Sequence, residues 1–338
     1  MSTDFLKLAV RSAEQATCAP RGLADIAVGA EYRSRFDKWD RNAAVRSRPL
    51  RKLEPATTAQ VYFPPELVPV RSHPLVAELG DSAHHRLLVH ALYQYLHFTS
   101  ELEDTAVIPV TMELSRGRSG LQLPAGMRRD AFNIVTDEAW HAQFSYELHT
   151  QIVENSAVPS PAFGVPQFVG RLATISNRLR THIPALGPLL FAVVSETLIS
   201  SLLAEVPHDR RLPTAVRQTV ADHAVDEGRH HAYFRDVLRL LWRALTPAER
   251  SMAGPWLPAI VMAFLEPDYA AVADSLALLG LRADQIEAVL TESYPRDRVL
   301  ATVAAAARST ISYCEEVGAL SDAATRDAFA PLLSAAVG

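Results

Sequence analysis

Apolar residues recur every three or four positions from about Ser82 almost to the C-terminus, and this spacing places them on one face of a helix. The alternation that strands show is nearly absent, and Pro or Gly separates the periodic segments. We therefore predict an all-α protein. The predicted helices cover residues 82–115, 128–154, 166–182, 185–205, 212–245, 247–265, 268–279, 282–292, 296–317 and 321–336.

Residues 1–80 follow a different pattern. Residues 31–54 are rich in Arg and Lys, and the segment "VYFPPELVPVRSHPL" beginning at Val61 cannot be helical throughout, because Pro breaks a helix interior. No linker or repeat divides the chain into two folds. We predict a single domain in which a non-helical N-terminal arm, residues 1–80, packs on a helical domain, residues 81–338.

Composition narrows the function classes. The 338 residues are 49% hydrophobic and 21% charged with a formal net charge of -5, so no global charge attracts nucleic acid. No apolar run is long enough to span a membrane, and the N-terminus lacks the pattern of a signal peptide. Cys18 and Cys314 form no disulfide framework. We expect a cytoplasmic protein that binds neither nucleic acid nor membrane.

The predicted helix over residues 212–245 places ionisable side chains where its apolar stripe should run. His223, Glu227 and His230 share one face with Val220 and Phe234. A buried, unpaired Glu is costly, and two neighbouring His do not remove that cost unless something binds all three. The pattern indicates an inward-facing ligand site.

A second predicted helix carries the same motif. Glu138 and His141 lie one turn apart on a face with Ile134 and Leu148. The ExxH spacing lets a carboxylate and an imidazole converge on one ion, as in carboxylate-bridged dimetal bundles. One ExxH is weak evidence, but such a bundle also needs a lone inward Glu from each of two further helices.

Both lone carboxylates are present. Glu196 interrupts an otherwise apolar row, and Glu103 continues the apolar stripe of the first predicted helix. Glu101 falls instead on the face of His90 and His97, which we interpret as solvated, so we choose Glu103. The order Glu, ExxH, Glu, ExxH indicates two similar helical hairpins related by a pseudo-twofold axis.

The charge of these groups points to two metal ions. Four carboxylates carry four negative charges, so two divalent ions would leave the cluster near neutral. Imidazole and carboxylate ligands do not distinguish Fe from Mn, but a site without Cys suits iron that activates O₂. His223 lies one turn before Glu227 and adds a third imidazole to six expected ligands, which should tune the potential of one metal.

At these residues the chain resembles the ferritin-like non-haem diiron arylamine N-oxygenases, the family of p-aminobenzoate N-oxygenase. The likeness runs from about Tyr62 to Phe264 and is most specific at "SETLIS", "DEAWH" and "HAVDEGRH". It implies a ferritin-like four-helix bundle with a dimetal core and extra C-terminal helices. The ligands that it implies are Glu103, Glu138, His141, Glu196, His223, Glu227 and His230, with His223 in the place of the family's additional histidine.

The resemblance also implies a reaction. Members of the family oxidise an aromatic amine through hydroxylamine and nitroso stages to a nitroarene, with two Fe ions, O₂ as cosubstrate and a peroxo-diiron(III) oxidant. The likeness is greatest to the branch that acts in chloramphenicol biosynthesis, and it implies a homodimer. An external electron donor is also expected, because the sequence holds neither a GxGxxG motif on a strand nor an Fe–S cysteine cluster.

The inner stripes predict a substrate pocket near the metals. The residues expected to line it are Tyr95, Phe98, Thr99 and Ser200. No Arg lies among them, although a guanidinium is the usual partner of a carboxylate. This absence favours a neutral or larger arylamine over aminobenzoate, unless Arg296 or Arg298 reaches in from a later helix.

Three other interpretations share the bundle. A ribonucleotide-reductase-type radical subunit should have Tyr four residues after the first ExxH histidine, where this chain has Ser145. An iron-storage ferritin is the non-enzymatic alternative, but the arm and C-terminal helices would be hard to fit into its shell. A desaturase or hydrocarbon monooxygenase is the remaining enzyme alternative. The third histidine argues against all three.

The stretch from Arg33 to Lys52 is locally basic, with eight Lys or Arg side chains and two Asp side chains. Such an excess in an acidic chain is typical of a solvated face or of a surface that attracts an acidic partner. We expect this stretch either to fold over the bundle or to receive an acidic electron donor.

Overall fold

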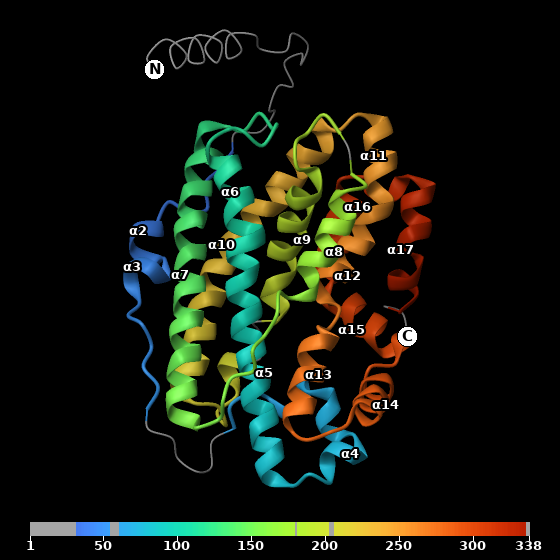
Figure 1. The fold of residues 1–338 in the computed structure, drawn as a ribbon. Coiled ribbons are helices and arrows are strands. Elements are labelled where there is room, and N and C mark those ends of the chain that lie inside the picture. Colours follow the sequence, from blue (N-terminus) through green and yellow to red (C-terminus); the bar gives the residue numbers. More distant parts are fainter. Residues whose placement is uncertain (1–31, 55–60, 180, 203–205, 336–338) are drawn as a thin grey trace, which may run out of the picture. The chain divides into compact units, whose positions relative to one another are not determined.

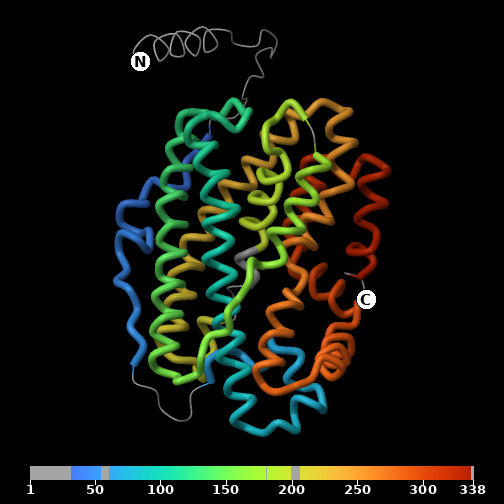
Figure 2. The backbone as a smooth tube through the Cα atoms, in the orientation of Figure 1, coloured from blue at the N-terminus to red at the C-terminus, as the bar shows by residue number. Residues whose placement is uncertain are grey.

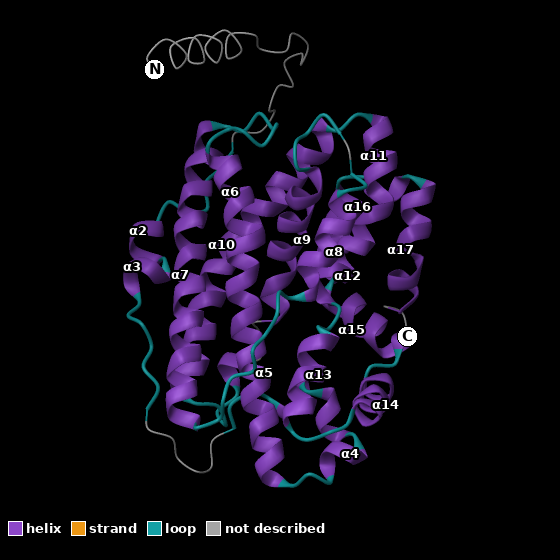
Figure 3. Ribbon diagram, viewed as in Figure 1, coloured by secondary structure: helices purple, strands orange, loops and turns teal. Residues whose placement is uncertain are grey.

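The computed structural model describes residues 32–54, 61–179, 181–202 and 206–335, with the side chains of residues 199–202 outside the description. The chain divides into two compact units, Met1–Arg33 and Ser34–Gly338, and the account below concerns the described residues of the second. These residues form helices and loops, and no strand occurs among them (Figure 3). The prediction of an all-α fold is confirmed.

Four long helical stretches form a ferritin-like bundle. α5 (Asp81–Leu102) continues through η3 (Glu103–Val107) into α6 (Ile108–Ser115), and this stretch packs against α7 (Ala125–Ser156). α9 (Leu186–Leu202) packs against α10 (Thr214–Ala244) in the same way. α7 also contacts α10, so the two pairs meet, and Figure 1 shows the four stretches running side by side.

Pro and Gly set the ends of these helices. Gly80, with φ of 80°, lies directly before α5 in a conformation that glycine adopts without strain. Pro124 and Pro213 lie directly before α7 and α10, where the missing N–H removes no helical hydrogen bond. α7 ends at Ser156, and Ala157 directly after it adopts a left-handed conformation.

The helix widens into a π turn at η3, between α5 and α6. Pro109 follows this turn closely and has no N–H to donate to the carbonyl of Thr105, so the regular helical bond cannot form there. Turns of this kind are frequent at functional sites because they insert a residue and turn the neighbouring side chains. Glu103 begins the turn and is completely buried.

The other elements surround the bundle or precede it. They are α2 (Trp39–Asn42), α3 (Ala44–Ser47), η1 (Pro65–Leu67), η2 (Pro69–Ser72), α4 (Pro74–Ala77), α8 (Gln167–Ser176), η4 (Val206–His208), α11 (Pro247–Ala253), η5 (Gly254–Trp256), α12 (Leu257–Leu265), α13 (Tyr269–Leu278), α14 (Ala283–Ser293), α15 (Arg296–Ala306), α16 (Arg308–Glu316), η6 (Ala319–Ser321) and α17 (Ala323–Ala335). α12 and α16 pack on α9, and Figure 2 shows the orange and red C-terminal helices along this side of the bundle.

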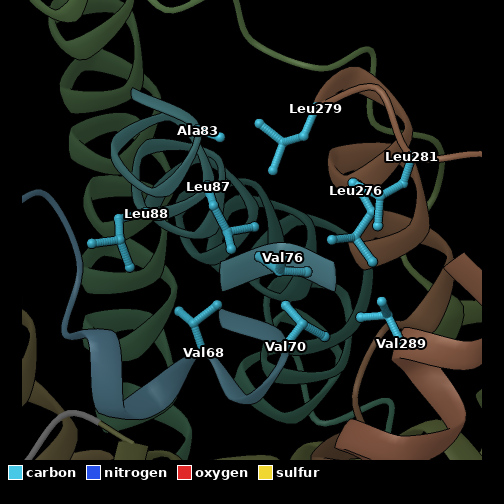
Figure 4. Packing of buried hydrophobic residues seen from close by; sticks show 10 residues of the cluster. All are labelled: Val68, Val70, Val76, Ala83, Leu87, Leu88, Leu276, Leu279, Leu281 and Val289. Atoms are coloured by element: carbon cyan, nitrogen blue, oxygen red, sulfur yellow. The ribbon is translucent and has the colours of Figure 1, made fainter. Parts of the chain in front are cut away.

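An apolar cluster near the start of α5 joins the arm to the C-terminal helices. Val68, Val70 and Val76 meet Leu87 of α5 and Leu276 of α13 (Figure 4). Each buried aliphatic side chain of this kind contributes about 1.5–3 kcal/mol. Residues 68–76 of the arm therefore share a core with the helices. The described part of the arm contains the short helices α2, α3 and α4, so it is not, as the sequence predicted, non-helical throughout. The boundary at residue 80, and the role of the residues before Tyr32, stay predictions.

One stretch of the described residues, Pro247–Leu278, is long and apolar enough to cross a membrane by length and composition. It is not one continuous helix, because α12 ends at Leu265 and α13 begins at Tyr269. Part of it packs on α8 and α9, as the core helices of many proteins do. The stretch is weak evidence for a membrane span.

The contact between α8 and α9 gives a test of the packing. A Cβ atom added at Gly187 would lie 2.5 Å from Ser176 Oγ and 2.7 Å from Ser176 Cα, whereas one added at Gly170 would meet nothing within 4 Å. We expect Gly187→Ala to lower the free energy of unfolding by about 1–3 kcal/mol through overpacking. The matched change Gly170→Ala should raise it by about 0.4–1 kcal/mol. Urea unfolding of both variants decides, and equal stability of the two would contradict the packing described.

Candidate metal centre

All seven predicted metal ligands lie together in the bundle. Two groups of ligand atoms, each within 4.8 Å of one another, are formed by Glu103, Glu138, His141 and His223, and by Glu138, His141, Glu227 and His230. Glu196 joins them, because its Oε2 lies 3.7 Å from His230 Nδ1. Every one of these side chains is buried.

The helices place these ligands by their register. Glu138 and His141 are three residues apart on α7, and Glu227 and His230 repeat that spacing on α10. His223 lies four residues before Glu227 and its Nε2 is 3.1 Å from Glu227 Oε1. Spacings of three and four bring side chains to one helix face, so both faces point to the axis between the helices.

The unsatisfied ligand atoms fit metal ions. Both oxygens of Glu103 and of Glu196, together with Glu227 Oε2, are buried and lack a hydrogen-bond partner. A buried polar atom left unpaired costs about 1–3 kcal/mol, and more where it is charged. Carboxylate and imidazole donors without thiolate suit iron or manganese. The residues present therefore fit a dimetal centre.

Two aspartates each contact the ExxH histidine of the opposite helix. Asp226 of α10 lies 3.2 Å from His141 Nε2 on α7, and Asp137 of α7 lies 3.2 Å from His230 Nε2 on α10. A carboxylate accepts hydrogen bonds only, so Nε2 carries the proton and Nδ1 keeps the lone pair that a metal needs. The pairing is reciprocal and supports the predicted pseudo-twofold relation.

The two aspartates sit in different electrostatic surroundings. Arg229 forms an ion pair with Asp226. Burial opposes ionisation of Asp226, but the hydrogen bond and charge of His141, with further charge from Arg229, lower its pKa. Burial raises the pKa of Asp137, although its bond to His230 works in the opposite direction.

These aspartates were not among the predicted site residues, yet a signal for them exists. Each ExxH motif is preceded by Asp, as "DEAWH" and "DEGRH". The arm also reaches this layer: Trp39 Nε1 donates to Asp137 and the N–H of Ala44 donates to Asp226. No sequence pattern pointed to these two donors, because their position depends on the path of the arm.

The pKa values of the metal-free site follow from burial and mutual repulsion. Burial, with the carboxylates of Glu138 and Glu227, raises the pKa of Glu103 well above its usual value. Burial alone would lower the pKa of His141, but Glu138 and Asp226 outweigh it and raise that pKa strongly. Metal binding must therefore displace protons from the site.

His223 behaves differently from the ExxH histidines. Burial, with the charge of His141, lowers the pKa of His223. A neutral imidazole can bind a metal without first losing a proton. His223 lies beside both Glu103 and His141. Its Nε2 is 3.9 Å from Glu103 Oε1, and its ring centroid is 4.2 Å from that of His141.

A cavity of about 460 Å³ lies beside the centre. Tyr95 and Phe98 line it, with Phe168 and Phe264 forming further aromatic walls. Burial raises the pKa of Tyr95, a hydrogen bond with Thr99 works in the opposite direction, and the carboxylates of Glu227 and Glu103 raise it further, so this phenol lies within electrostatic reach of the metal ligands. The cavity therefore approaches the cluster at Tyr95.

The other predicted pocket residues have different positions. Thr99 is buried but is not among the residues that line the cavity, and the side chain of Ser200 lies outside the described residues. Arg298 lines the cavity as the sequence allowed. Arg171 lines it too, but donates to the carbonyl oxygens of residues 266 and 267.

One premise behind the choice of Glu103 is wrong, although Glu103 itself is buried and Glu101 is partly exposed. The face of Glu101 is not solvated throughout, because His90 is 3% exposed. The loop after α7 covers this face: Phe163 stacks on His97, whose Nε2 lies 3.1 Å from the Gly164 carbonyl oxygen. Helical periodicity cannot show where a distant loop lies.

An all-α bundle with two overlapping carboxylate–histidine clusters in its core defines a protein of the dimetal-carboxylate class. The chain matches the family model for p-aminobenzoate N-oxygenase AurF over residues 39–318 and belongs to that family. It is therefore a non-haem diiron monooxygenase of the N-oxygenase type. No curated protein matches the chain.

The buried position of Glu103 predicts a difference from its exposed neighbour. We expect the metal-free parent to bind two Fe(II) ions, and Glu103→Ala to weaken one of them at least tenfold, since even residues that only support a ligand contribute 10–100-fold, roughly. Glu101→Ala should bind as the parent does. Affinity should fall as pH falls, because the raised pKa of His141 makes protons compete with metal.

Anaerobic titration calorimetry in two buffers of different ionisation enthalpy measures both the affinity and the protons released. One tightly bound zinc ion with no binding of iron, or an equal loss in the Glu101→Ala variant, would contradict the site.

Proposed function

We propose that the chain is an O₂-dependent arylamine N-oxygenase that forms a nitroarene through hydroxylamine and nitroso intermediates. In this proposal the seven buried Glu and His side chains hold two Fe ions, which supply the oxidising power when bound. The observation that carries the proposal is a cavity with aromatic walls whose lining includes Tyr95, a residue whose pKa responds to the charges of Glu227 and Glu103 in the cluster of unsatisfied ligand atoms. The enzyme alternative is another diiron oxygenase or desaturase, and the non-enzymatic alternative is a ferritin-like iron-binding protein.

The chain's own residues bind and orient the amine in this scheme. Phe98 packs edge-on against Phe168, with ring centroids 5.3 Å apart, and these rings offer an apolar slot for an aromatic ring. The Tyr95 hydroxyl is buried and lines the cavity, and Thr99 lowers its pKa as a hydrogen-bonding neighbour does. In this scheme the hydroxyl binds the substrate nitrogen as that atom approaches the metal ligands.

The first oxidation illustrates the electron balance. One oxygen atom of O₂ enters an N–H bond and gives the hydroxylamine, while the other leaves as water with two protons and two electrons. The electrons come from an external donor. The aromatic side chains that line the cavity give the reacting nitrogen apolar surroundings.

The substrate that we propose is a ring with a sizeable substituent, and the aminophenyl precursor of chloramphenicol is our candidate. Pockets of this size usually enclose ligands larger than one small ring. Phe98 and Tyr95 offer no cation near the metals, and Arg298 lies with Glu266 and Asp268 among the other lining residues. Such a mixture of charges suits a polar uncharged substituent better than a carboxylate.

Turnover by the iron-loaded protein tests this function. We expect reduced protein exposed to O₂ to convert the aminophenyl precursor to the nitro compound, and to convert p-aminobenzoate more slowly. His223→Ala should still bind iron through the six remaining ligands but should oxidise the amine at least tenfold more slowly, because a supporting nitrogen donor is lost. Mass spectrometry of products formed under ¹⁸O₂ provides the measurement.

Incorporation of oxygen from water, or hydroxylation of carbon alone, would refute N-oxygenation from O₂. An equal rate in His223→Ala and the parent would remove the special role of His223 while leaving the function intact.

We also propose that the protein works as a cytoplasmic homodimer. A further part of the proposal is that an acidic one-electron carrier docks on the arm. Arg35, Lys38 and Arg41 are exposed on the described part of the arm. The other basic residues are partly engaged: Arg51 pairs with Asp222. Arg48 also pairs with Asp222, and Arg46 lies over the Trp39 ring. We therefore choose Arg35, Lys38 and Arg41 as the residues to vary.

Salt dependence tests the docking. Turnover with an acidic carrier should fall steeply as the Debye length shrinks from about 30 Å to about 8 Å, because the attraction acts between exposed charges. Replacing Arg35, Lys38 and Arg41 by Ser should lower the rate at low salt and flatten this dependence. Turnover with a small chemical reductant should barely change in either protein.

The matched control replaces three exposed arginines elsewhere, namely Arg210, Arg243 and Arg308. If the two triple variants behave alike, or if both electron sources show one salt dependence, the arm does not receive the donor.

A further inference from the structure

Two side chains of the described part of the arm, Phe36 and Trp39, lie next to the predicted ligand His230 and its aspartate partner. The Trp39 indole Nε1–H lies 2.9 and 3.0 Å from the two oxygens of Asp137, and Asp137 is the carboxylate that holds His230 Nε2. Phe36 lies parallel to the His230 ring, with centroids 6.1 Å apart. The arm therefore fixes both the hydrogen-bonded edge and one face of this imidazole.

The same arm repeats the arrangement at the other histidine. The backbone N–H of Ala44 lies 3.1 and 3.3 Å from the oxygens of Asp226, and Asp226 holds His141 Nε2. Trp39 and Ala44 are both buried, and both aspartates are 1% exposed or less. Water is therefore a poor substitute for either donor.

These contacts do more than pack the arm against the bundle, because each carboxylate orients one histidine through a hydrogen bond. A carboxylate that loses a donor can turn toward another one, such as Arg229, which lies within 4.0 Å of Asp137. Its histidine would then lose the partner that fixes the ring and its tautomer. Residues that orient a metal ligand in this way contribute roughly 10–100-fold to metal affinity.

We propose that Trp39 and the N–H of Ala44 are positioning groups of the metal centre, each acting on a different histidine. Trp39 acts through Asp137 on His230, and Ala44 acts through Asp226 on His141. The inference rests on the ligand set in the proposed function. It makes the arm a part of the metal site and not only a cover for the bundle.

Two substitutions remove the two donors separately. Trp39→Phe keeps an aromatic ring and deletes the indole N–H. Ala44→Pro deletes the backbone N–H at the first position of α3, where Pro is well tolerated, and the preceding Ala43 already has the extended conformation that Pro requires. The double variant removes both donors.

Anaerobic titration of the metal-free full chain with Co(II), followed by absorption and calorimetry, measures each binding step. The parent should bind two ions. Each single variant should keep one step at the parent affinity and lose about 10–100-fold in the other, and the double variant should lose in both. Trp242→Phe is the control. Trp242 is buried, as Trp39 is, but it lies on α10 about three turns beyond His230.

Parent affinity in both single variants would overturn the inference, and so would an equal loss in Trp242→Phe, which would indicate a general effect of core packing. A parent that binds fewer than two ions would instead overturn the proposed ligand set. If Trp39→Phe does not fold, Ala44→Pro decides alone, because it tests the same relation at the second carboxylate.

Discussion

The repulsion between carboxylates in a dry core is the constraint on which the rest of this structure depends. Glu103, Glu138, Glu196 and Glu227 are all completely buried. Each ion taken from water costs several kcal/mol, on the order of what a whole hydrophobic side chain gains, unless charge of opposite sign lies beside it. The crossed aspartate–histidine pairs hold one imidazole of each ExxH motif beside these carboxylates. Four helices must converge to bring the groups together, which explains why the site and the fold cannot be separated.

The positions of the helices and the ligands could be predicted from sequence because both are local properties. Helical periodicity marks the buried face, and a Glu or His on that face, such as Glu196, violates it visibly. Asp137 violates nothing, since it lies one residue off the stripe of Glu138. It is buried because α7 meets α10 on one side and the arm on the other, and a single stripe does not describe a helix covered on two faces.

The remaining differences have the same cause, which is contact between segments distant in sequence. His90 is buried under a loop that follows a different helix, and Ala44 contributes only a backbone N–H, which every residue except Pro possesses. The π turn at Glu103 is an intermediate case. Pro109 predicts an irregular helix locally, but only the converging helices determine that the widened turn faces the cluster.

The arm links the surface of the protein to its metal site thermodynamically. If Trp39 and Ala44 hold the carboxylates that hold the histidines, then docking of the arm strengthens metal binding, and by reciprocity metal binding strengthens docking of the arm by the same factor. An electron carrier bound to the exposed side of the arm would act on the same equilibrium. A basic segment that only covered the bundle could not transmit such an effect, because nothing would join it to the ligands. The hydrogen bonds at Asp137 and Asp226 provide that connection.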